Sequence, residues 1–117
     1  MKTERRIYGD WGEEMVARYL THRDYRILDR NVKYGSLELD IIAEWLGEII
    51  FVEVKTRHSE NFSKAEDAVD IKKQENIKEA ARAYMLHHGL HNPFRYDVIT
   101  IVGDATTYQV NHIKRAF

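Results

Sequence analysis

Two stretches of alternating apolar and charged residues lie near the middle of the chain, at 36–42 (SLELDII) and 49–55 (IIFVEVK). Successive side chains point to opposite faces of a β-strand, so each stretch predicts a strand. Leu46-Gly47 lies between them and suits a tight turn, which predicts an antiparallel hairpin. In such a hairpin Asp40 and Glu53 lie near each other on neighbouring strands.

The second of these strands changes character along one of its faces. Ile49 and Phe51 share that face with Glu53, Lys55 and Arg57, so the face begins apolar and becomes charged. A strand with one solvated face would instead be polar along the whole of that face. The change therefore predicts a strand that starts in the core and emerges into a cleft.

On the first strand, strict alternation places Leu37, Leu39 and Ile41 on one face and Glu38 and Asp40 on the other. A simpler interpretation is that the two acids are outward positions of a one-sided sheet. The Glu-x-Lys pattern of the second strand is likewise common as a solvated ion pair. The combination of an acid on one strand with Glu-x-Lys on the next, both after apolar runs, favours a functional site.

The acids and the lysine suit metal-dependent phosphodiester hydrolysis. Two carboxylates held close together repel, and one tends to take up a proton unless a cation lies between them. Oxygen ligands of this kind suit Mg²⁺ or Mn²⁺, which lowers the pKa of a bound water and stabilises a developing negative charge. Lys55 is placed to orient or deprotonate the attacking water, or to neutralise phosphate charge.

A third acid, Glu13, lies on a predicted helix over Tyr8 to His22. It borders the apolar stripe of that helix. A glutamate on the core-facing edge of a helix is costly unless it is paired or bound to a metal. The alternative is that Glu13 stabilises the first helical turn through the helix dipole, and the sequence leaves both interpretations open. The residues of the stripe are Gly12, Met15, Val16, Tyr19 and Leu20.

The remaining pattern completes the order helix, three strands, helix, two strands, which predicts an α/β fold with a mixed sheet flanked by helices. Lys73 falls on the inner face of the second helix, where an amphipathic helix usually has an apolar residue. The further predicted elements are a strand at 25–33, a polar loop at 57–65, a helix at 66–88, and strands at 94–102 and 106–110.

Composition is typical of one folded domain over residues 1–117, with 44% hydrophobic residues. No segment is long enough to span a membrane, no signal peptide is visible, and no cysteine is present, so a cytoplasmic protein is expected. The net charge of −1 argues against strong non-specific nucleic-acid binding but allows a local basic surface. Arg57, Lys64 and Lys73 lie nearest the acids in the sequence and are the expected phosphate contacts.

Motifs along almost the whole chain resemble the YraN family of small bacterial proteins, within the restriction-endonuclease-like PD-(D/E)xK nuclease superfamily. The motifs are GDWGE at 9–13, Ala17, Tyr19-Leu20, YRIL at 25–28, Arg30-Asn31, ELDIIA at 38–43, FVEVKTR at 51–57, Lys73-Gln74, RYDV at 95–98, His112-Ile113 and Ala116-Phe117.

This resemblance implies a restriction-endonuclease-like fold similar to that of archaeal Holliday-junction resolvases, DNA as the partner and, by analogy, a homodimer. It implies that Mg²⁺ or Mn²⁺ is bound by Asp40, Glu53 and the backbone carbonyl of Val54. Glu13 would join this site through water, and Lys55 would serve the nucleophilic water. Residues Lys73 and Gln74 would approach from the second helix.

Two positions depart from the pattern. Leu39 stands where the superfamily has proline, and Leu37 stands where the family usually has glycine. Leucine needs more room than glycine, so the backbone at the cleft floor is expected to differ. This difference concerns the fit of the substrate more than metal binding.

Three functions are compatible with these residues. The first is a Mg²⁺- or Mn²⁺-dependent DNA endonuclease acting on branched or single-stranded structures. The second is a nucleic-acid-binding accessory protein of repair, recombination or DNA uptake that does not cleave. In the third, the acids and Lys55 form a buried ion-pair network, whose stability would depend on that lysine. The intact acid-acid-lysine set favours the first function over the third.

Overall fold

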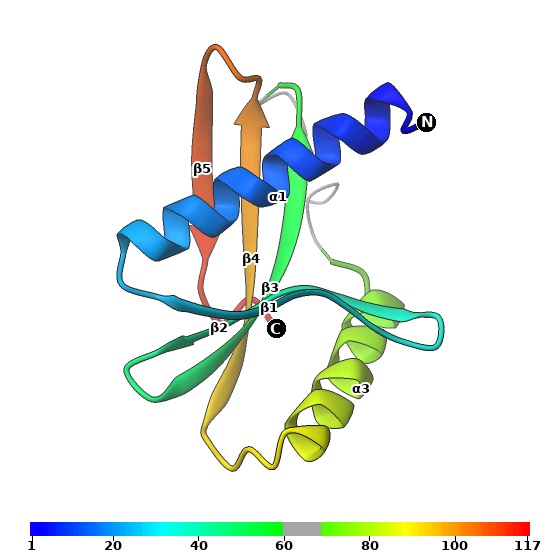
Figure 1. Cartoon of the computed structure of the whole chain (residues 1–117), viewed down its shortest axis with the longest axis vertical. Coiled ribbons are helices and arrows are strands. Elements are labelled where there is room, and N and C mark those ends of the chain that lie inside the picture. Colours follow the sequence, from blue (N-terminus) through cyan, green and yellow to red (C-terminus); the bar gives the residue numbers. More distant parts are fainter. Residues whose placement is uncertain (60–68) are drawn as a thin grey trace.

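The computed structural model describes residues 1–59 and 69–117 and contains a single five-stranded sheet with a helix on each face (Figure 1). The predicted α/β class and the order α-β-β-β-α-β-β are confirmed. No helix in the described part of the chain is long and apolar enough to cross a membrane. The elements are α1 (Glu4–His22), β1 (Arg26–Tyr34), β2 (Leu37–Trp45), β3 (Glu48–Arg57), α3 (Ile71–His87), β4 (Phe94–Gly103) and β5 (Tyr108–Ile113).

The strands follow the chain order across the sheet, β1-β2-β3-β4-β5. β3 and β4 are parallel, and every other neighbouring pair is antiparallel, so the predicted mixed sheet and the predicted β2–β3 hairpin are both confirmed. Parallel neighbours need a crossover connection, and α3 lies within the connection from β3 to β4. This connection places α3 on the face opposite α1.

Each face of the sheet carries its own apolar cluster. Val16 and Leu20 of α1 pack on one face with Ile50 of β3, while Ile77 of α3 packs on the other face with Phe51. Figure 1 shows α1 crossing β3, β4 and β5, with α3 near the β1–β2 end of the sheet. The alternation of β3 therefore fills both clusters, as a strand covered by helices on both faces requires.

Neither helix begins where the apolar pattern predicts: α1 begins earlier and α3 begins later. α1 begins at Glu4, not at Tyr8, and the Thr3 hydroxyl caps it by accepting a hydrogen bond from the Arg6 amide at 3.1 Å. The first turn is exposed, so it carries no apolar stripe that would reveal it. α3 begins at Ile71, after the N-cap Asp70, so its predicted extension back to residue 66 is wrong at residues 69 and 70, and residues 66–68 lie outside the described residues.

The last strand is also displaced from its predicted range of 106–110. Asp104 accepts hydrogen bonds from the amides of Thr106 and Thr107 at 2.9 and 3.1 Å, which extends the turn. The strand therefore starts at Tyr108 and continues to Ile113. Asx-type turns of this kind compete with strand pairing and are invisible to a period-2 pattern.

The strict alternation predicted for β2 is wrong at Asp40. Leu39 packs in the α3 cluster together with Ile42, whereas Ile41 packs in the α1 cluster. Asn31, which the β1–β2 register places opposite Asp40, has a φ of +54°, a backbone conformation in which asparagine is several-fold enriched. Both strands are thus irregular at the same level, and this irregularity positions the candidate site.

Candidate functional site

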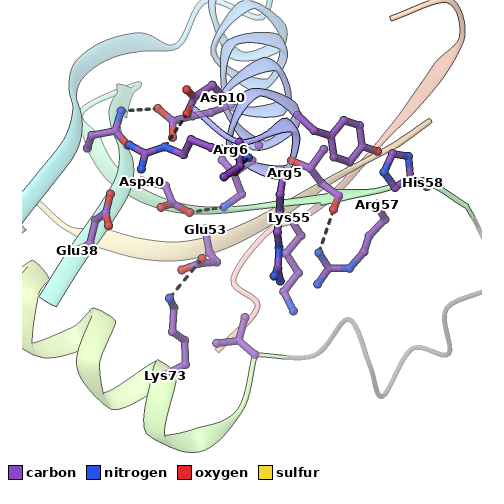
Figure 2. Close-up of a pocket in the computed structure, with 18 of the residues that line it drawn as sticks. Arg5, Arg6, Asp10, Glu38, Asp40, Glu53, Lys55, Arg57, His58 and Lys73 are labelled. Atoms are coloured by element: carbon purple, nitrogen blue, oxygen red, sulfur yellow. Dashed lines mark hydrogen bonds and ion pairs between the residues drawn. The ribbon is translucent and has the colours of Figure 1, made fainter. Parts of the chain in front are cut away.

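The candidate site lies where β2 and β3 separate. Their backbone pairing runs from Trp45↔Glu48 to Ile41↔Val52. Beyond that pair, the Val54 amide donates a hydrogen bond to Asp40 Oδ2 at 2.9 Å. The Asp40 carboxylate therefore takes the place of a backbone acceptor and lies directly beside β3, as Figure 2 shows.

Glu53 lies next to Asp40 and is largely shielded from water, with 13% of its side chain exposed. Burial first, and then the negative charge of Asp40 and a hydrogen bond with it, raise the pKa of Glu53 to about 8 against the opposing effects of Lys73 and Lys55. In the metal-free protein Glu53 therefore holds a proton at pH 7. This is the behaviour expected of two carboxylates that share a site without a cation between them.

Glu13 approaches the same pair from α1. Its Oε1 accepts hydrogen bonds from Asn31 Nδ2 at 2.8 Å and from Arg30 Nε at 3.4 Å. Burial raises the pKa of Glu13, as does the Asp40 charge, whereas Arg30 and Asn31 lower it. The helix-dipole interpretation of Glu13 is wrong, because the helix begins at Glu4 and Glu13 lies well beyond its first turn.

Three cations approach the acids from two elements. Lys73 of α3 lies with its Nζ 3.9 Å from Glu53 Oε1, and 51% of its side chain is exposed. Lys55 lowers the pKa of Glu53, which places its charge close to that carboxylate. Arg57 donates from Nη1 to the Thr56 carbonyl at 3.0 Å. Figure 2 shows Lys55 and Arg57 following Glu53 along β3, with Lys73 approaching from the helix.

These side chains line a cleft of about 1710 Å³. Pockets for small ligands are usually about 300–1,000 Å³, so the cleft is large enough for a macromolecular segment. Among the described residues it is lined by six basic and seven acidic side chains. The basic ones are Arg5, Arg6, Lys33, Lys55, Arg57 and Lys73, and the acidic ones are Glu4, Asp10, Glu13, Glu38, Asp40, Glu53 and Asp70.

Of the four predicted nucleic-acid contacts, one does not line this cleft and one lies outside the part of the chain that the structure describes. Gln74 does not line it, and its amide donates instead to the Val69 carbonyl at 2.8 Å. Lys64 lies outside the described residues. The structure thus brings Arg57 and Lys73 of the four predicted contacts to the acids.

The oxygen donors of the site fit a hard divalent cation. Mg²⁺ usually takes one or two carboxylates and completes its shell with water and phosphate, and Asp40 and Glu53 supply two. The N–H and C=O of one strand residue point toward the same neighbour, so the Val54 carbonyl is also directed to the Asp40 side. The described residues contain no group of three or more histidine, cysteine, aspartate or glutamate side chains arranged to hold a metal ion.

The sequence prediction missed the residues that place Glu13. Gly12 lies so close to Thr56 of β3 that no side chain fits between them, which brings α1 against the strand beside the acids. Asn31 holds the Glu13 carboxylate from β1. The signal for Asn31 was its residue type, because asparagine is one of the few residues that tolerate positive φ inside a strand.

A second polar cluster, also missed, lies on β4 away from the cleft. Asp97 is fully buried, at 0% exposure, and accepts hydrogen bonds from Arg95 Nε at 3.0 Å and from the Arg115 amide at 3.1 Å. His112 Nε2 lies 2.7 Å from Asp97 Oδ2, and the Tyr19 hydroxyl lies 3.0 Å from His112 Nδ1. None of these residues lines the cleft, so the cluster ties the C-terminal segment to the sheet.

Comparison with known proteins places the chain in a family. The model of a family described as "Uncharacterised protein family UPF0102" matches residues 12–101. A UPF0102 protein of Phocaeicola vulgatus is 42% identical over 114 residues, covering 97% of this chain and 94% of that protein. One from Syntrophomonas wolfei is 42% identical, covering 96% and 98%, and one from Caldanaerobacter subterraneus is 38% identical, covering 99% and 98%. The matched span includes Glu13, Asp40, Glu53 and Lys55.

Proposed function

This chain belongs to the uncharacterised protein family UPF0102, the YraN-like family that its motifs indicated, and we propose that it is a divalent-metal-dependent DNA endonuclease of the PD-(D/E)xK superfamily. The observation that carries the proposal is the pairing of Asp40 with Glu53 on the floor of a large cleft, with Lys55 beside them. Fold alone would not support an activity, whereas this donor set supports phosphodiester hydrolysis.

Each residue of the site has a role in the proposed reaction. Asp40, Glu53 and the Val54 carbonyl would hold Mg²⁺ or Mn²⁺, which would supply an activated water and neutralise charge on the phosphate. Lys55 would orient the attacking water and assist its deprotonation. Glu13 lies close enough to Asp40 to join through a water molecule, and Arg30 and Asn31 fix its carboxylate.

The charge of the cleft supports a nucleic-acid substrate only when the acids are neutralised. Seven acidic and six basic side chains line the described part of the cleft, and with Glu53 protonated the remaining six acids balance the six basic groups, so the metal-free cleft has no net attraction for phosphate at pH 7. A divalent cation held by Asp40 and Glu53 would make the cleft net positive. Arg57 and Lys73 then remain to contact phosphates on either side of the bond that is cleaved.

A cleavage assay tests the proposal. Linear duplex, single-stranded, flap and four-way-junction DNA are incubated with Mg²⁺, with Mn²⁺ and with EDTA. Metal-dependent cutting by the wild type is expected to disappear in Asp40→Asn and in Lys55→Ala. Glu38→Gln is the matched control, because Glu38 is an exposed acid of the same strand that also lines the cleft. Equal cutting by all variants, or none on any substrate, contradicts the endonuclease.

One observation favours a second function, a nucleic-acid-binding accessory protein that does not cleave. The acids already have cationic partners without a metal: Lys73 lies near Glu53, and Arg30 bonds Glu13. In this case DNA binding would depend on Arg57 and Lys73 and would survive Asp40→Asn. Binding without cutting in the assay above would favour this function over the endonuclease.

A further inference from the structure

A row of aromatic rings begins in the cleft, where Tyr8 and His58 line it, and leads away from the cleft toward β5. Tyr8 of α1 and His58, the residue directly after β3, stack with ring centroids 4.0 Å apart and planes 3° apart. Tyr8 also stacks on Trp11 at 5.7 Å, and Trp11 meets Tyr108 of β5 edge to face at 5.8 Å. The row therefore joins α1 to the end of β3 and to β5.

The two rings of the Tyr8–His58 pair differ in how they are held. Tyr8 is half-buried, and its hydroxyl donates to the Gly103 carbonyl at 2.6 Å. His58 is exposed. The pair therefore presents an exposed ring that is stacked on a ring held in place by a hydrogen bond. That arrangement suits stacking of a further flat ring.

The pair lies in the same cleft as the acids. Tyr8 and His58 line it together with Asp40 and Glu53, and Figure 2 shows His58 beyond Arg57 on the far side from Glu53. Five residues of extended chain, at about 3.3 Å each, separate His58 from Glu53 by roughly 16 Å. Stacked nucleotides are about 3.4 Å apart along one strand, so this distance corresponds to a few nucleotides.

A guanidinium stands beside the rings. Arg57 directly precedes His58 in the chain, as Figure 2 shows, and lines the cleft together with Tyr8 and His58. Burial and the charge of Asp104 raise the pKa of Tyr8, and the charge of Arg57 opposes them. Arg5 lines the same cleft from the first turn of α1. Unpaired nucleic acid alternates flat bases with charged phosphates, and an aromatic pair next to arginine matches both parts.

We infer that Tyr8 and His58, with Arg57 beside them, form a stacking platform for an unpaired base, so that the cleft accepts single-stranded nucleic acid or the single-stranded arm of a branched molecule. A continuous duplex does not offer this contact, because each of its bases is already covered by its neighbours. The inference rests on the proposed nucleic-acid cleft and names the class of strand that the cleft binds. Unpaired bases occur in both DNA and RNA, so the test includes both.

Binding of labelled oligonucleotides tests the platform. Fluorescence anisotropy is measured with a short oligothymidylate, the matching oligouridylate and a blunt hairpin duplex, with Ca²⁺ in place of Mg²⁺ to separate binding from cleavage. His58→Ala is the main variant, and His58→Phe restores a flat ring. His91→Ala is the matched control, because His91 is another exposed histidine that does not line this cleft.

His58→Ala is expected to weaken binding of single strands about tenfold or more, since stacking one base on an aromatic ring is worth that much. Binding of the duplex is expected to change little, and His58→Phe to recover most of the loss. An abasic position placed along the oligothymidylate should weaken the wild type at one location and leave His58→Ala unaffected there. Unchanged single-strand binding by His58→Ala, or an equal loss on the duplex, overturns the platform.

Failure of the stacking platform and failure of the proposed endonuclease activity give different results. If no substrate is cut but His58→Ala still loses single-strand binding selectively, the platform stands in a protein that binds without cleaving. If Asp40→Asn abolishes cutting while His58→Ala keeps wild-type single-strand affinity, the endonuclease stands and the platform is wrong. The oligouridylate arm shows which sugar the same platform prefers.

Discussion

Gly12 of α1 and Thr56 of β3 are in such close contact that a methyl group on Gly12 would overlap the threonine side chain. This contact sets the distance between α1 and the strand that carries Glu53 and Lys55. Because Glu13 follows Gly12 directly, the same contact sets how near Glu13 comes to Asp40.

Gly12→Ala is therefore expected to destabilise the protein. Alanine favours a helix over glycine by about 1 kcal/mol, but overpacking costs about 1–3 kcal/mol, so the overlap outweighs the gain. Gly9→Ala is the matched control, because Gly9 lies in the same helix with nothing within 4 Å of an added methyl, and it should stabilise. Urea unfolding measures both changes, and equal stabilisation by the two variants would contradict the close contact.

The sequence predicted the parts of the site that depend on one strand or helix alone. The period-2 pattern of β3 places Glu53 and Lys55 on one face after two buried residues, and the structure confirms that the face leads into the cleft. The irregularity at Asp40 was not predictable in this way. It depends on Asn31 of a different strand and on where the pairing with β3 ends, which is tertiary information.

The same reasoning explains why the Asp97 cluster was missed. Arg95 and Asp97 alternate with Tyr96 and Val98, a pattern that also fits one solvated face of a strand. The partners His112 of β5 and the Arg115 amide beyond it show that the aspartate is buried and paired. A buried charge becomes recognisable when its partners, distant in sequence, are known.

Asp97→Asn is expected to cost up to about 3–5 kcal/mol of stability at neutral pH, because it removes the fully buried anion beside Arg95 and leaves that guanidinium, among the described residues, only its ion pair with Glu48. Asp10→Asn is the control, since Asp10 pairs with Lys2 and Arg6 at the surface, and it should change stability far less than Asp97→Asn. Chemical denaturation of both variants measures this difference. Similar costs for the two would show that the Asp97 cluster adds little.

Asp97 also makes the stability of the folded protein decrease in acid. Burial acts to raise the pKa of Asp97, but hydrogen bonds from His112, Arg95 and the Arg115 amide outweigh it and lower the pKa. A carboxyl group whose pKa is lower in the folded protein than in the unfolded chain stabilises the folded state at any pH above the unfolded pKa of about 3.9. This stabilisation is lost as the pH falls through the pKa of the folded state. Wild type should therefore lose stability relative to Asp97→Asn below about pH 4, in thermal melts. Parallel pH profiles of the two proteins would show that protonation of Asp97 is not the cause of the lost stability in acid.

Glu53 has the opposite pH dependence in the metal-free protein. Its pKa rises from about 4.3 in an unfolded chain to about 8 in the fold, because of burial first and Asp40 second. Because its pKa is raised in the fold, Glu53 stabilises the folded protein fully when the pH is below its unfolded pKa. This stabilisation is lost as the pH rises toward the folded pKa of about 8. In EDTA the wild-type melting temperature should fall between pH 5 and 9 relative to that of Glu53→Gln, which mimics the protonated acid. A constant difference across this range would contradict the raised pKa.

Lys73 is expected to matter for binding more than for stability. Its contact with Glu53 is long, at 3.9 Å, and half of the lysine side chain is exposed, so Lys73→Ala should change stability by less than about 1 kcal/mol. If it contacts one phosphate, its removal should reduce the salt slope of DNA binding by about 1. Lys72→Ala is the control on the same helix, since Lys72 does not line the cleft. Equal slopes for the two variants would remove Lys73 from the interface.

Nucleic-acid affinity should depend on a divalent cation even where no bond is cut. Acidic side chains slightly outnumber basic ones among the described residues of the cleft, so in EDTA and above the Glu53 pKa of about 8, where Glu53 is also ionised, the acids repel phosphate. Asp40→Asn combined with Glu53→Gln removes that repulsion and should bind DNA severalfold more tightly than the wild type in EDTA. With Ca²⁺ the order should reverse, because only the wild type retains the carboxylates that hold the cation. Glu38→Gln should follow the wild type in both conditions, and wild-type affinity that is the same in Ca²⁺ and EDTA would argue against a metal between Asp40 and Glu53.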